Sequence, residues 1–169
     1  MTQVLPEKEQ PQRRKVSDHV QPEVVLNIEP LHRVLREFIM LSRAQHDEVG
    51  LDIEYLPDLD AMLKYGDKAV LVTARYKGIL VGYIFYLIGP YKHNTELLYA
   101  QIEAVYLIPS FRSGRTAIKM FRLGEEAVKK QLARFVLISS TIKKDISKLL
   151  NYLDYKPVET VYKKDISYE

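Results

Sequence analysis

The sequence predicts an α/β domain in which helices cover both faces of a mixed β-sheet. Helix-type and strand-type hydrophobic patterns follow one another in the order α-α-β-β-β-α-β-α-β, and interleaved helices are typical of such a sheet. The chain has 169 residues, about one domain's worth, and its hydrophobic content of 47% is enough for a real core. No internal repeat or low-complexity block interrupts the pattern. We therefore expect one domain built on a single central sheet.

Two helices open the pattern. From Glu29 to Ala44 the apolar residues recur at helical spacing, which predicts an amphipathic first helix. A second, short helix is expected after Pro57, because proline suits the first turn of a helix. The residues from Glu23 to Ile28 also allow a strand ahead of the first helix.

Three strands are expected in the middle of the chain. Two runs rich in apolar, β-branched and aromatic residues, Ala69–Tyr76 and Ile79–Ile88, meet at Lys77-Gly78 and indicate a hairpin. We expect Gly89-Pro90 to end the second of these strands. The third strand is predicted over Leu97–Ile108.

The last part of the chain alternates helix and strand. A helix is predicted from just after Gly114 to about Leu132, and a buried strand over Arg134–Ser139. A short helix over Asp145–Leu153 and a last alternating strand over Lys156–Ile166 complete the expected order.

Residues 1–21 differ in composition from the rest. They include Pro6 and Pro11, several glutamines and the basic triplet Arg13-Arg14-Lys15, with little apolar content. This composition predicts a flexible N-terminal extension ahead of a single domain over residues 22–169. The basic triplet is compatible with solvated charge, with contact to an acidic partner or nucleic acid, and with an extension that joins a homodimer or a partner chain.

Composition limits the remaining possibilities. The formal charge of +3 permits an anionic ligand, but nucleic-acid binding calls for a strongly basic face. The chain has no cysteine, which excludes a disulfide framework, a thiolate metal site and a cysteine nucleophile, and no metal site is expected. The N-terminus lacks an apolar signal region, and the longest apolar run, Ile79–Ile88, is too short to cross a membrane. We expect a cytoplasmic protein without a membrane partner.

The segment from Tyr106 to Phe121 carries the strongest signal. A strand pattern stops at Pro109, passes through a loop with Arg112, Gly114 and Arg115, and becomes a helix pattern that Thr116 caps or opens. Free backbone N–H groups at the positive end of a helix dipole bind phosphate or pyrophosphate. An ordinary strand-to-helix turn with solvated arginines is the alternative interpretation.

The same residues carry a resemblance to a known family. Leu107-x-Pro109-x-Phe111-Arg112, followed by Gly-Arg-Thr-Ala, resembles the acetyl-CoA loop of the GNAT N-acetyltransferases. The segment Leu149–Glu159 resembles the family's Leu-Gly-Phe/Tyr-Lys-Pro ending. The similarity covers about Leu31 to Lys164, and its spacing is closest to the GNAT-like proteins of bacteriophage genomes, which implies the host cytoplasm or the virion as location.

This resemblance implies a GNAT-like acyl-CoA N-acyltransferase fold and acetyl-CoA as the cofactor. The positions that correspond to the family's cofactor site are Tyr106, Leu107, Arg112, Ser113, Gly114, Arg115, Thr116 and Ala117. One glycine of the family's loop is replaced by Arg115, whose side chain could contact a CoA phosphate or block the loop.

The resemblance also assigns candidate catalytic residues. Glu103 falls on the family's general-base position, although a rim glutamate paired with a lysine is the alternative. His93 follows the Gly89-Pro90 break and is a secondary candidate, because an imidazole titrates near neutral pH. The family's proton-donating tyrosine aligns with Leu150, so Tyr152, two residues later, is the substitute candidate.

An acidic group lies between the two predicted N-terminal helices. His46, Asp47, Glu48 and Asp52 are expected in the connecting loop, where carboxylates would attract a cationic amine or simply form an acidic surface.

Two functional hypotheses result. The first is an acetyl-CoA-dependent N-acetyltransferase that acts on the primary amine of a small molecule or peptide by direct transfer. The second is a GNAT-fold structural or interaction protein, for example virion-associated or host-binding, in which catalysis is lost. The loop and Glu103 favour the enzyme, whereas Leu150 and the basic N-terminal extension favour the second hypothesis.

Overall fold

A five-stranded sheet forms the centre of the protein, and its strands lie side by side in the order β1-β2-β3-β4-β5. The computed structural model describes residues 23–50, 54–55, 57–112 and 115–164. The first four strands pair antiparallel, whereas β5 runs parallel to β4. The strands are β1 (Val25–Ile28), β2 (Ala69–Tyr76), β3 (Ile79–Tyr91), β4 (Asn94–Leu107) and β5 (Val136–Ile138).

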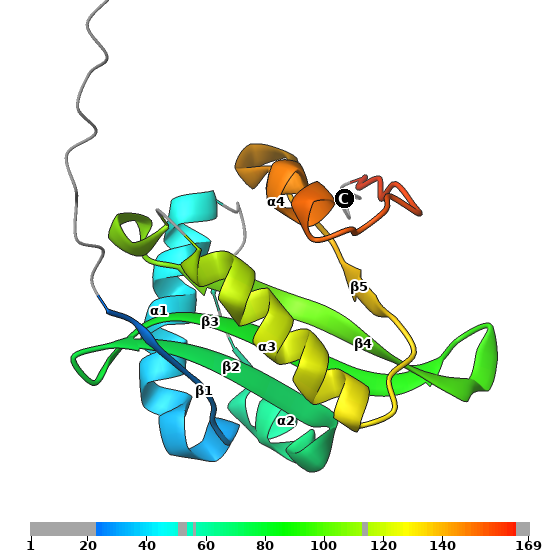
Figure 1. Cartoon of the computed structure of the whole chain (residues 1–169), viewed down its shortest axis with the longest axis horizontal. Coiled ribbons are helices and arrows are strands. Elements are labelled where there is room, and N and C mark those ends of the chain that lie inside the picture. Colours follow the sequence, from blue (N-terminus) through cyan, green and yellow to red (C-terminus); the bar gives the residue numbers. More distant parts are fainter. Residues whose placement is uncertain (1–22, 51–53, 56, 113–114, 165–169) are drawn as a thin grey trace, which may run out of the picture.

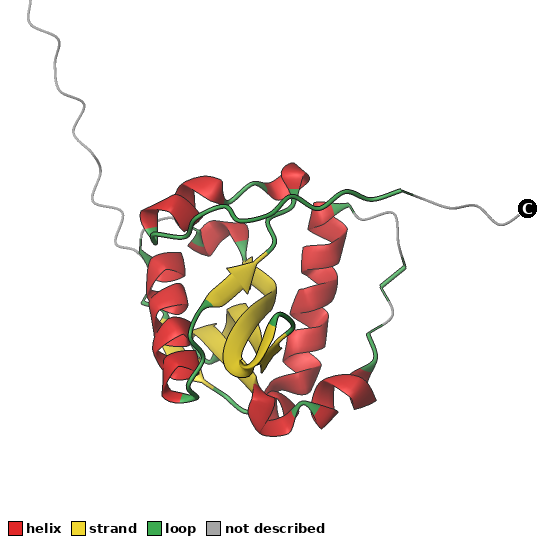
Figure 2. Cartoon of the chain, turned by 90° about the vertical axis from the view of Figure 1, so that its right-hand side faces the viewer, coloured by secondary structure: helices red, strands yellow, loops and turns green. Residues whose placement is uncertain are grey.

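Helices cover both faces of the sheet, as the sequence predicts (Figures 1 and 2). The helix α3 crosses one face, and α1 and α2 lie on the other. The short α4 follows β5 and packs on the α3 side. The helices are α1 (Leu31–Val49), α2 (Leu59–Lys64), α3 (Thr116–Lys130) and α4 (Ser147–Tyr152), with 3-10 turns η1 (Gly66–Lys68), η2 (Pro109–Phe111) and η3 (Ile142–Lys144).

The hydrophobic runs are nearly continuous because the central strands are buried on both faces. Along β2, Val70, Val72 and Ala74 pack beneath α3, while Leu71 faces α1. This alternation follows the two-residue repeat of a strand. On the α1 face, Phe38 packs edge-on against Phe85 with their ring centroids 5.7 Å apart. Two apolar layers therefore hold the sheet between its helices.

Two glycines permit close approaches in this core. A Cβ on Gly124 in α3 would lie 2.3 Å from the hydroxyl oxygen of Tyr86, so only glycine lets the helix rest on this ring. The Tyr86 hydroxyl is buried, and no hydrogen-bond partner for it exists among the described residues. A Cβ on Gly82 would lie 2.5 Å from a side-chain carbon of Leu107, which brings β3 tightly against the end of β4.

An ionic group near the β2–β3 turn ties β1, α1 and the hairpin together. The guanidinium of Arg75 donates to both carboxylates of Glu29 and Glu37, and to the carbonyl of Gly78 at 2.8 Å. Glu29 also accepts a hydrogen bond from Thr73. We call these five residues the Arg75 cluster. The side chains of Arg75 and Glu29 are only 17% and 24% exposed, whereas that of Glu37 is 44% exposed, so the guanidinium at the centre of the cluster is the part that is shielded from water.

The β3–β4 hairpin is longer than predicted. Gly89-Pro90 does not end β3, which continues to Tyr91, and β4 begins at Asn94 rather than Leu97. The reason is that β2 pairs with β3 only as far as Leu87. Beyond that residue β3 is an edge strand on one side, where proline's missing N–H leaves no ladder bond unmade.

Two other expectations were wrong. The first helix continues past Ala44 to Val49, and Gly50 ends it in the left-handed region with φ of 63°. The last strand predicted over 156–166 is absent in its described part, residues 156–164. There Val158, Val161 and Tyr162 are at least 75% exposed. A strand needs a neighbouring strand to pair with, and this segment runs beside none.

No helix in the described ranges is long and apolar enough to cross a membrane.

Candidate functional site

The outer edge of β4 opens at Glu103. The register with β3 shifts there, because Tyr86 pairs with Ile102 while Phe85 pairs with Ala104, so Glu103 is the extra residue of a β-bulge. On the other side, β5 pairs with β4 only as far as Ile102. In the described part of the chain, β4 therefore has no strand neighbour on its β5 side from Glu103 to its end.

The bulge turns Glu103 toward the α1 side of the sheet. Ile102 and Val105 pack beneath α3, whereas Ala104 and Tyr106 pack beneath α1, so strand alternation from Ile102 places Glu103 on the α1 side. The residue is exposed, yet partial burial of its carboxyl raises the pKa of that group above the ordinary value. No lysine forms an ion pair with it among the described residues, so the paired-rim alternative is not what the structure shows.

The turn after β4 leads directly into α3. The N–H of Ile108 donates to the carbonyl of Val81 at 2.9 Å, and the 3-10 turn Pro109–Phe111 follows. Arg115 is the N-cap residue of α3 and its side chain makes no capping hydrogen bond, and Thr116 is the first residue of the helix. The first backbone N–H groups of a helix, here those from Thr116 onward, project out of its N-terminal end and can donate to an anion bound there. Ser113 and Gly114 lie outside the described residues.

A second ionic group lies beside this turn. The two Nη atoms of Arg112 each donate to the carboxylate of Glu48 at 2.7 Å, and its Nε donates to the carbonyl of Leu107 at 2.7 Å. The same carboxylate accepts the hydroxyl of Tyr106 at 2.9 Å and pairs with the ammonium of Lys144 in η3. We call Glu48, Arg112, Tyr106 and Lys144 the Glu48 cluster.

These contacts account for the titration of the cluster. Hydrogen bonds from Arg112 and Lys144 lower the pKa of Glu48 to about 2. Glu48 in turn raises the pKa of Arg112, and burial raises the pKa of the Tyr106 hydroxyl. Because the cluster lies at the surface, solvent and salt screen its charges. At neutral pH it contains one carboxylate and two cations, which leaves an excess of positive charge.

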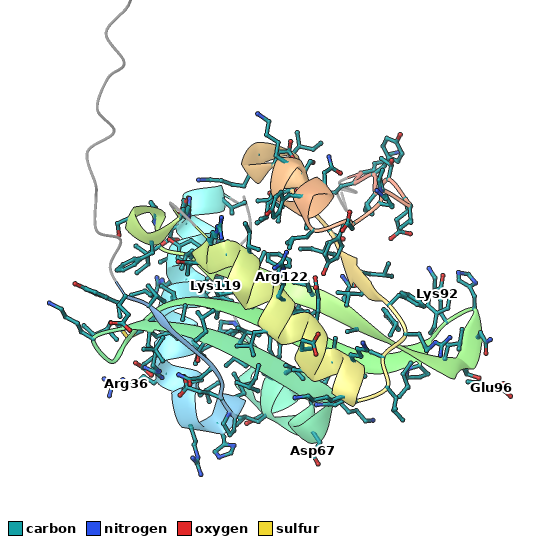
Figure 3. The ribbon with its side chains drawn as sticks, in the orientation of Figure 1. Arg36, Asp67, Lys92, Glu96, Lys119 and Arg122 are labelled. Carbon is teal, nitrogen blue, oxygen red and sulfur yellow. The ribbon has the colours of Figure 1, made fainter. Side chains whose placement is uncertain are left out.

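Further cations surround the start of α3. Arg115, Lys119 and Arg122 are exposed and follow helical spacing, so they share one side of α3. Figure 3 shows Lys119 and Arg122 along this helix, far from the hairpin tip that carries Lys92. Lys143, next to Lys144, donates to the carbonyl of Gly50 at 2.8 Å. The arrangement suits a ligand with several negative charges.

Known proteins share this architecture. No protein-family model and no curated protein matches the sequence, but solved structures match the fold. The ribosomal-protein-alanine N-acetyltransferase of Brucella melitensis biovar Abortus aligns with a TM-score of 0.68 at 18% identity, covering 86% of this chain and 99% of the other. A predicted acetyltransferase from Clostridium acetobutylicum with acetyl-CoA has a TM-score of 0.65 at 12% identity, covering 85% and 96%. The aminoglycoside acetyltransferase AAC(6')-Iy with a CoA bisubstrate analogue gives 0.64 at 16%, covering 85% and 99%.

The chain has the GNAT acetyltransferase fold.

Within this GNAT fold, one of the predicted catalytic residues lies far from the opening. His93 is at the tip of the β3–β4 hairpin, ten residues before Glu103, which is about 30 Å along a strand. Its ring contacts Tyr91 with centroids 5.3 Å apart. Tyr152 ends α4 and is 63% exposed, while Leu150 packs against the core beneath α3. The structure brings Glu103, Tyr106, Leu107 and Arg112 together along the end of β4.

A hollow of about 770 Å³ lies elsewhere in the molecule, between β1, the start of α1 and α2. Its lining includes Gln131, which is fifteen residues after Thr116 and therefore about 22 Å along α3 from the helix start. This hollow faces neither the bulge nor the cations around the start of α3. We therefore place the candidate site of the GNAT fold at the open edge of β4.

The sequence interpretation misplaced Glu48 and His46. Both lie in the last turns of α1, not in a loop, and Glu48 binds Arg112 instead of lining an acidic surface. One signal was available. The core-facing positions Val34, Phe38 and Leu41 continue at helical spacing to Gln45 and Glu48, so polar residues occupy a stripe that is otherwise apolar. Nothing in the sequence pointed to Lys144.

Proposed function

We propose that the protein binds acetyl-CoA along the open edge of β4 and acetylates a primary amine by direct transfer. The observation that carries this proposal is the bulge at Glu103, because the strand edge it opens ends at a helix start surrounded by cations. The GNAT acetyltransferases with the same fold support it.

The chain offers matching groups for each part of this cofactor. Acetyl-CoA, when bound, supplies the acetyl group as a thioester. The backbone of Tyr106 and Leu107 at the unpaired strand edge would hold the amide-bearing arm, as one strand binds another. The first turn of α3, at Thr116 and Ala117, together with Arg115 would hold the phosphates, and the sequence adds Ser113 and Gly114.

Glu103 is the proposed base. An amine must lose a proton before it can attack a thioester, and a carboxylate within reach, directly or through water, accepts that proton. A raised pKa makes this carboxylate a stronger base than an ordinary glutamate. Tyr152 or water remains the proposed proton donor, because Leu150 has no proton to give. His93 has no place in this mechanism.

For the acceptor we propose only a chemical class, a primary amine. Some of the similar structures are acetyltransferases of aminoglycosides, and one acts on ribosomal protein, so both small molecules and peptides belong in a screen. The phage-like spacing of the sequence adds a phage-encoded origin to the proposal.

The test measures binding and turnover separately. Calorimetry with acetyl-CoA and with CoA on the purified protein reports binding. A screen of polyamines, aminoglycosides, peptide N-termini and lysines reports turnover. Glu103→Gln keeps the side-chain shape and removes the base, so turnover is expected to fall by about 10²-fold or more with unchanged acetyl-CoA affinity.

A pH profile sharpens the assignment. Activity is expected to rise with pH through an apparent pKa above the ordinary glutamate value of 4.5, and this rise should be missing in Glu103→Gln.

The second candidate is a GNAT-fold binding protein without catalysis. The observation that favours it is the core packing of Leu150 where the family carries its tyrosine. No affinity for acetyl-CoA at millimolar concentration would leave this candidate and remove the enzyme.

A further inference from the structure

One carboxylate, that of Glu48, joins three parts of the chain beside the place where β4 and β5 stop pairing. Glu48 belongs to α1, which packs on the face of the sheet opposite α3. Arg112 follows β4, and Lys144 follows β5 in η3. Since both bind the same carboxylate, Glu48 connects the two segments that leave the opening on either side.

The guanidinium of Arg112 is already engaged. Its Nε donates to the carbonyl of Leu107, its two Nη atoms donate to Glu48, and its Cζ lies 5.4 Å from the ring centre of Tyr106. A bidentate pair of this kind fixes orientation as well as charge. Both Arg112 and Arg115 are exposed, but the guanidinium of Arg112 is held in one orientation by these hydrogen bonds.

We propose that Glu48 is a positioning residue for cofactor binding, which holds Arg112 and Lys144 on the two sides of the opening. Through Arg112 it fixes the carbonyl of Leu107 at the end of the open strand edge and the start of the turn into α3. The inference rests on the proposed function, because it concerns the same acetyl-CoA site.

The proposal makes a prediction with an unusual sign. Charge alone says that removing a carboxylate beside an anion site strengthens the binding of an anion. A positioning role predicts weaker binding instead. Without the Glu48 carboxylate, the turn would have to become ordered when the cofactor binds, and this ordering costs affinity.

The experiment compares Glu48→Gln with the matched control Asp47→Asn. Asp47 is the preceding residue of α1, its side chain is 71% exposed, and the control removes the same unit of charge. Calorimetry with acetyl-CoA is expected to show about tenfold weaker binding for Glu48→Gln and less than twofold change for Asp47→Asn. Acetyl-pantetheine, which lacks the phosphates of CoA, should lose affinity in the same variant, since the strand edge itself is affected. Equal or tighter binding by Glu48→Gln would overturn the proposal.

A second measurement needs no ligand. Amide hydrogen exchange of peptides covering residues 104–120 should become at least several-fold faster in Glu48→Gln than in the wild type and in Asp47→Asn, while exchange in β2 stays unchanged. If the wild type does not bind acetyl-CoA, the proposed function fails and exchange alone decides the positioning role. Unchanged exchange in this segment would refute it.

Discussion

The two ionic clusters lie at opposite ends of α1 and have opposite compositions. In the Arg75 cluster, one guanidinium is shared by two carboxylates, Glu29 and Glu37, near the helix start. In the Glu48 cluster, one carboxylate near the helix end is shared by two cations, Arg112 and Lys144. In each cluster the shared group is the more shielded one: the side chain of Arg75 is 17% exposed and that of Glu48 is 22% exposed. The cations of the Glu48 cluster are exposed, at 41% for Arg112 and 42% for Lys144.

This contrast separates a cluster that is expected to stabilise the fold from one that we propose to serve binding. In the Arg75 cluster every donor faces an acceptor of the protein itself, so nothing remains for a ligand. The Glu48 cluster keeps an excess of positive charge at the edge of an opening in the sheet. A pair of oppositely charged groups is thus informative about function only when its net charge and its exposure are considered together.

The largest expected effect on stability comes from Arg75→Met. The variant removes every hydrogen bond that the guanidinium donates and leaves Glu29, whose side chain is 24% exposed, without its cation, so the free energy of unfolding should fall by about 2–3 kcal/mol. For a domain of this size that corresponds to a melting temperature lower by roughly 4–12 °C. Acetyl-CoA affinity should not change.

Arg36→Met is the matched control for this variant, since Arg36 is an exposed arginine on α1 (Figure 3). Equal losses of melting temperature in the two variants would show that the Arg75 cluster contributes no special stability.

The second prediction concerns affinity. Arg112→Ala should weaken acetyl-CoA binding by about 1–3 kcal/mol, whether its charge meets a phosphate or its side chain orders the turn. The free energy of unfolding should fall by less than about 1 kcal/mol, because the cluster lies at the surface. Calorimetry and urea unfolding measure the two quantities. Lys92→Ala, at the hairpin tip, is the control and should leave binding intact.

Acid titration distinguishes the cluster in a third way. The folded pKa of Glu48 is about 2, below its ordinary value of 4.5, so its charged form stabilises the fold. This contribution is complete above the ordinary value and is lost as the pH falls toward 2. Urea unfolding between pH 6 and 2.5 should therefore show a shallower loss of stability in Glu48→Gln than in the wild type, by about 1 kcal/mol after allowance for solvent screening. Parallel curves would contradict this interpretation.

The smallest effect is expected for Lys144→Met. Its side chain is 42% exposed, so losing its pair with Glu48 should change the free energy of unfolding by less than about 0.5 kcal/mol. Acetyl-CoA affinity should fall only a few-fold, because Arg112 still holds the carboxylate. A larger loss of acetyl-CoA affinity than in Arg112→Ala would show that Lys144 contributes more to binding than Arg112.

The sheet was predictable from the sequence because its strands are buried on both faces and leave long apolar runs. The predictions failed where a partner decides the outcome. Pro90 breaks a strand only where a neighbouring strand needs its N–H, and on one side β2 had already ended. The residues near Val158 have a strand pattern but no strand beside them. Pairing of this kind is a property of the fold and is invisible in the local sequence.

The candidate site was predictable only in part. The position of Glu103 and of the turn after Leu107 followed from the resemblance, and the structure adds the bulge and the end of β5 that open the edge. The pairing of Glu48 with Arg112 joins residues 64 positions apart, and no local pattern connects them. The one local indication was that the polar residues Gln45 and Glu48 continue the core-facing stripe of α1.

The order of the strands also bears on how the chain folds as it is synthesised. β2, β3 and β4 are joined by two-residue turns, so their contacts are local and can form early. β5 pairs in parallel with β4 and must wait until α3 has crossed the sheet. The nascent chain is therefore expected to complete its antiparallel platform on the ribosome first. We therefore expect β5 to pair with β4 last, and the ion pair between Lys144 and Glu48 to form only after that.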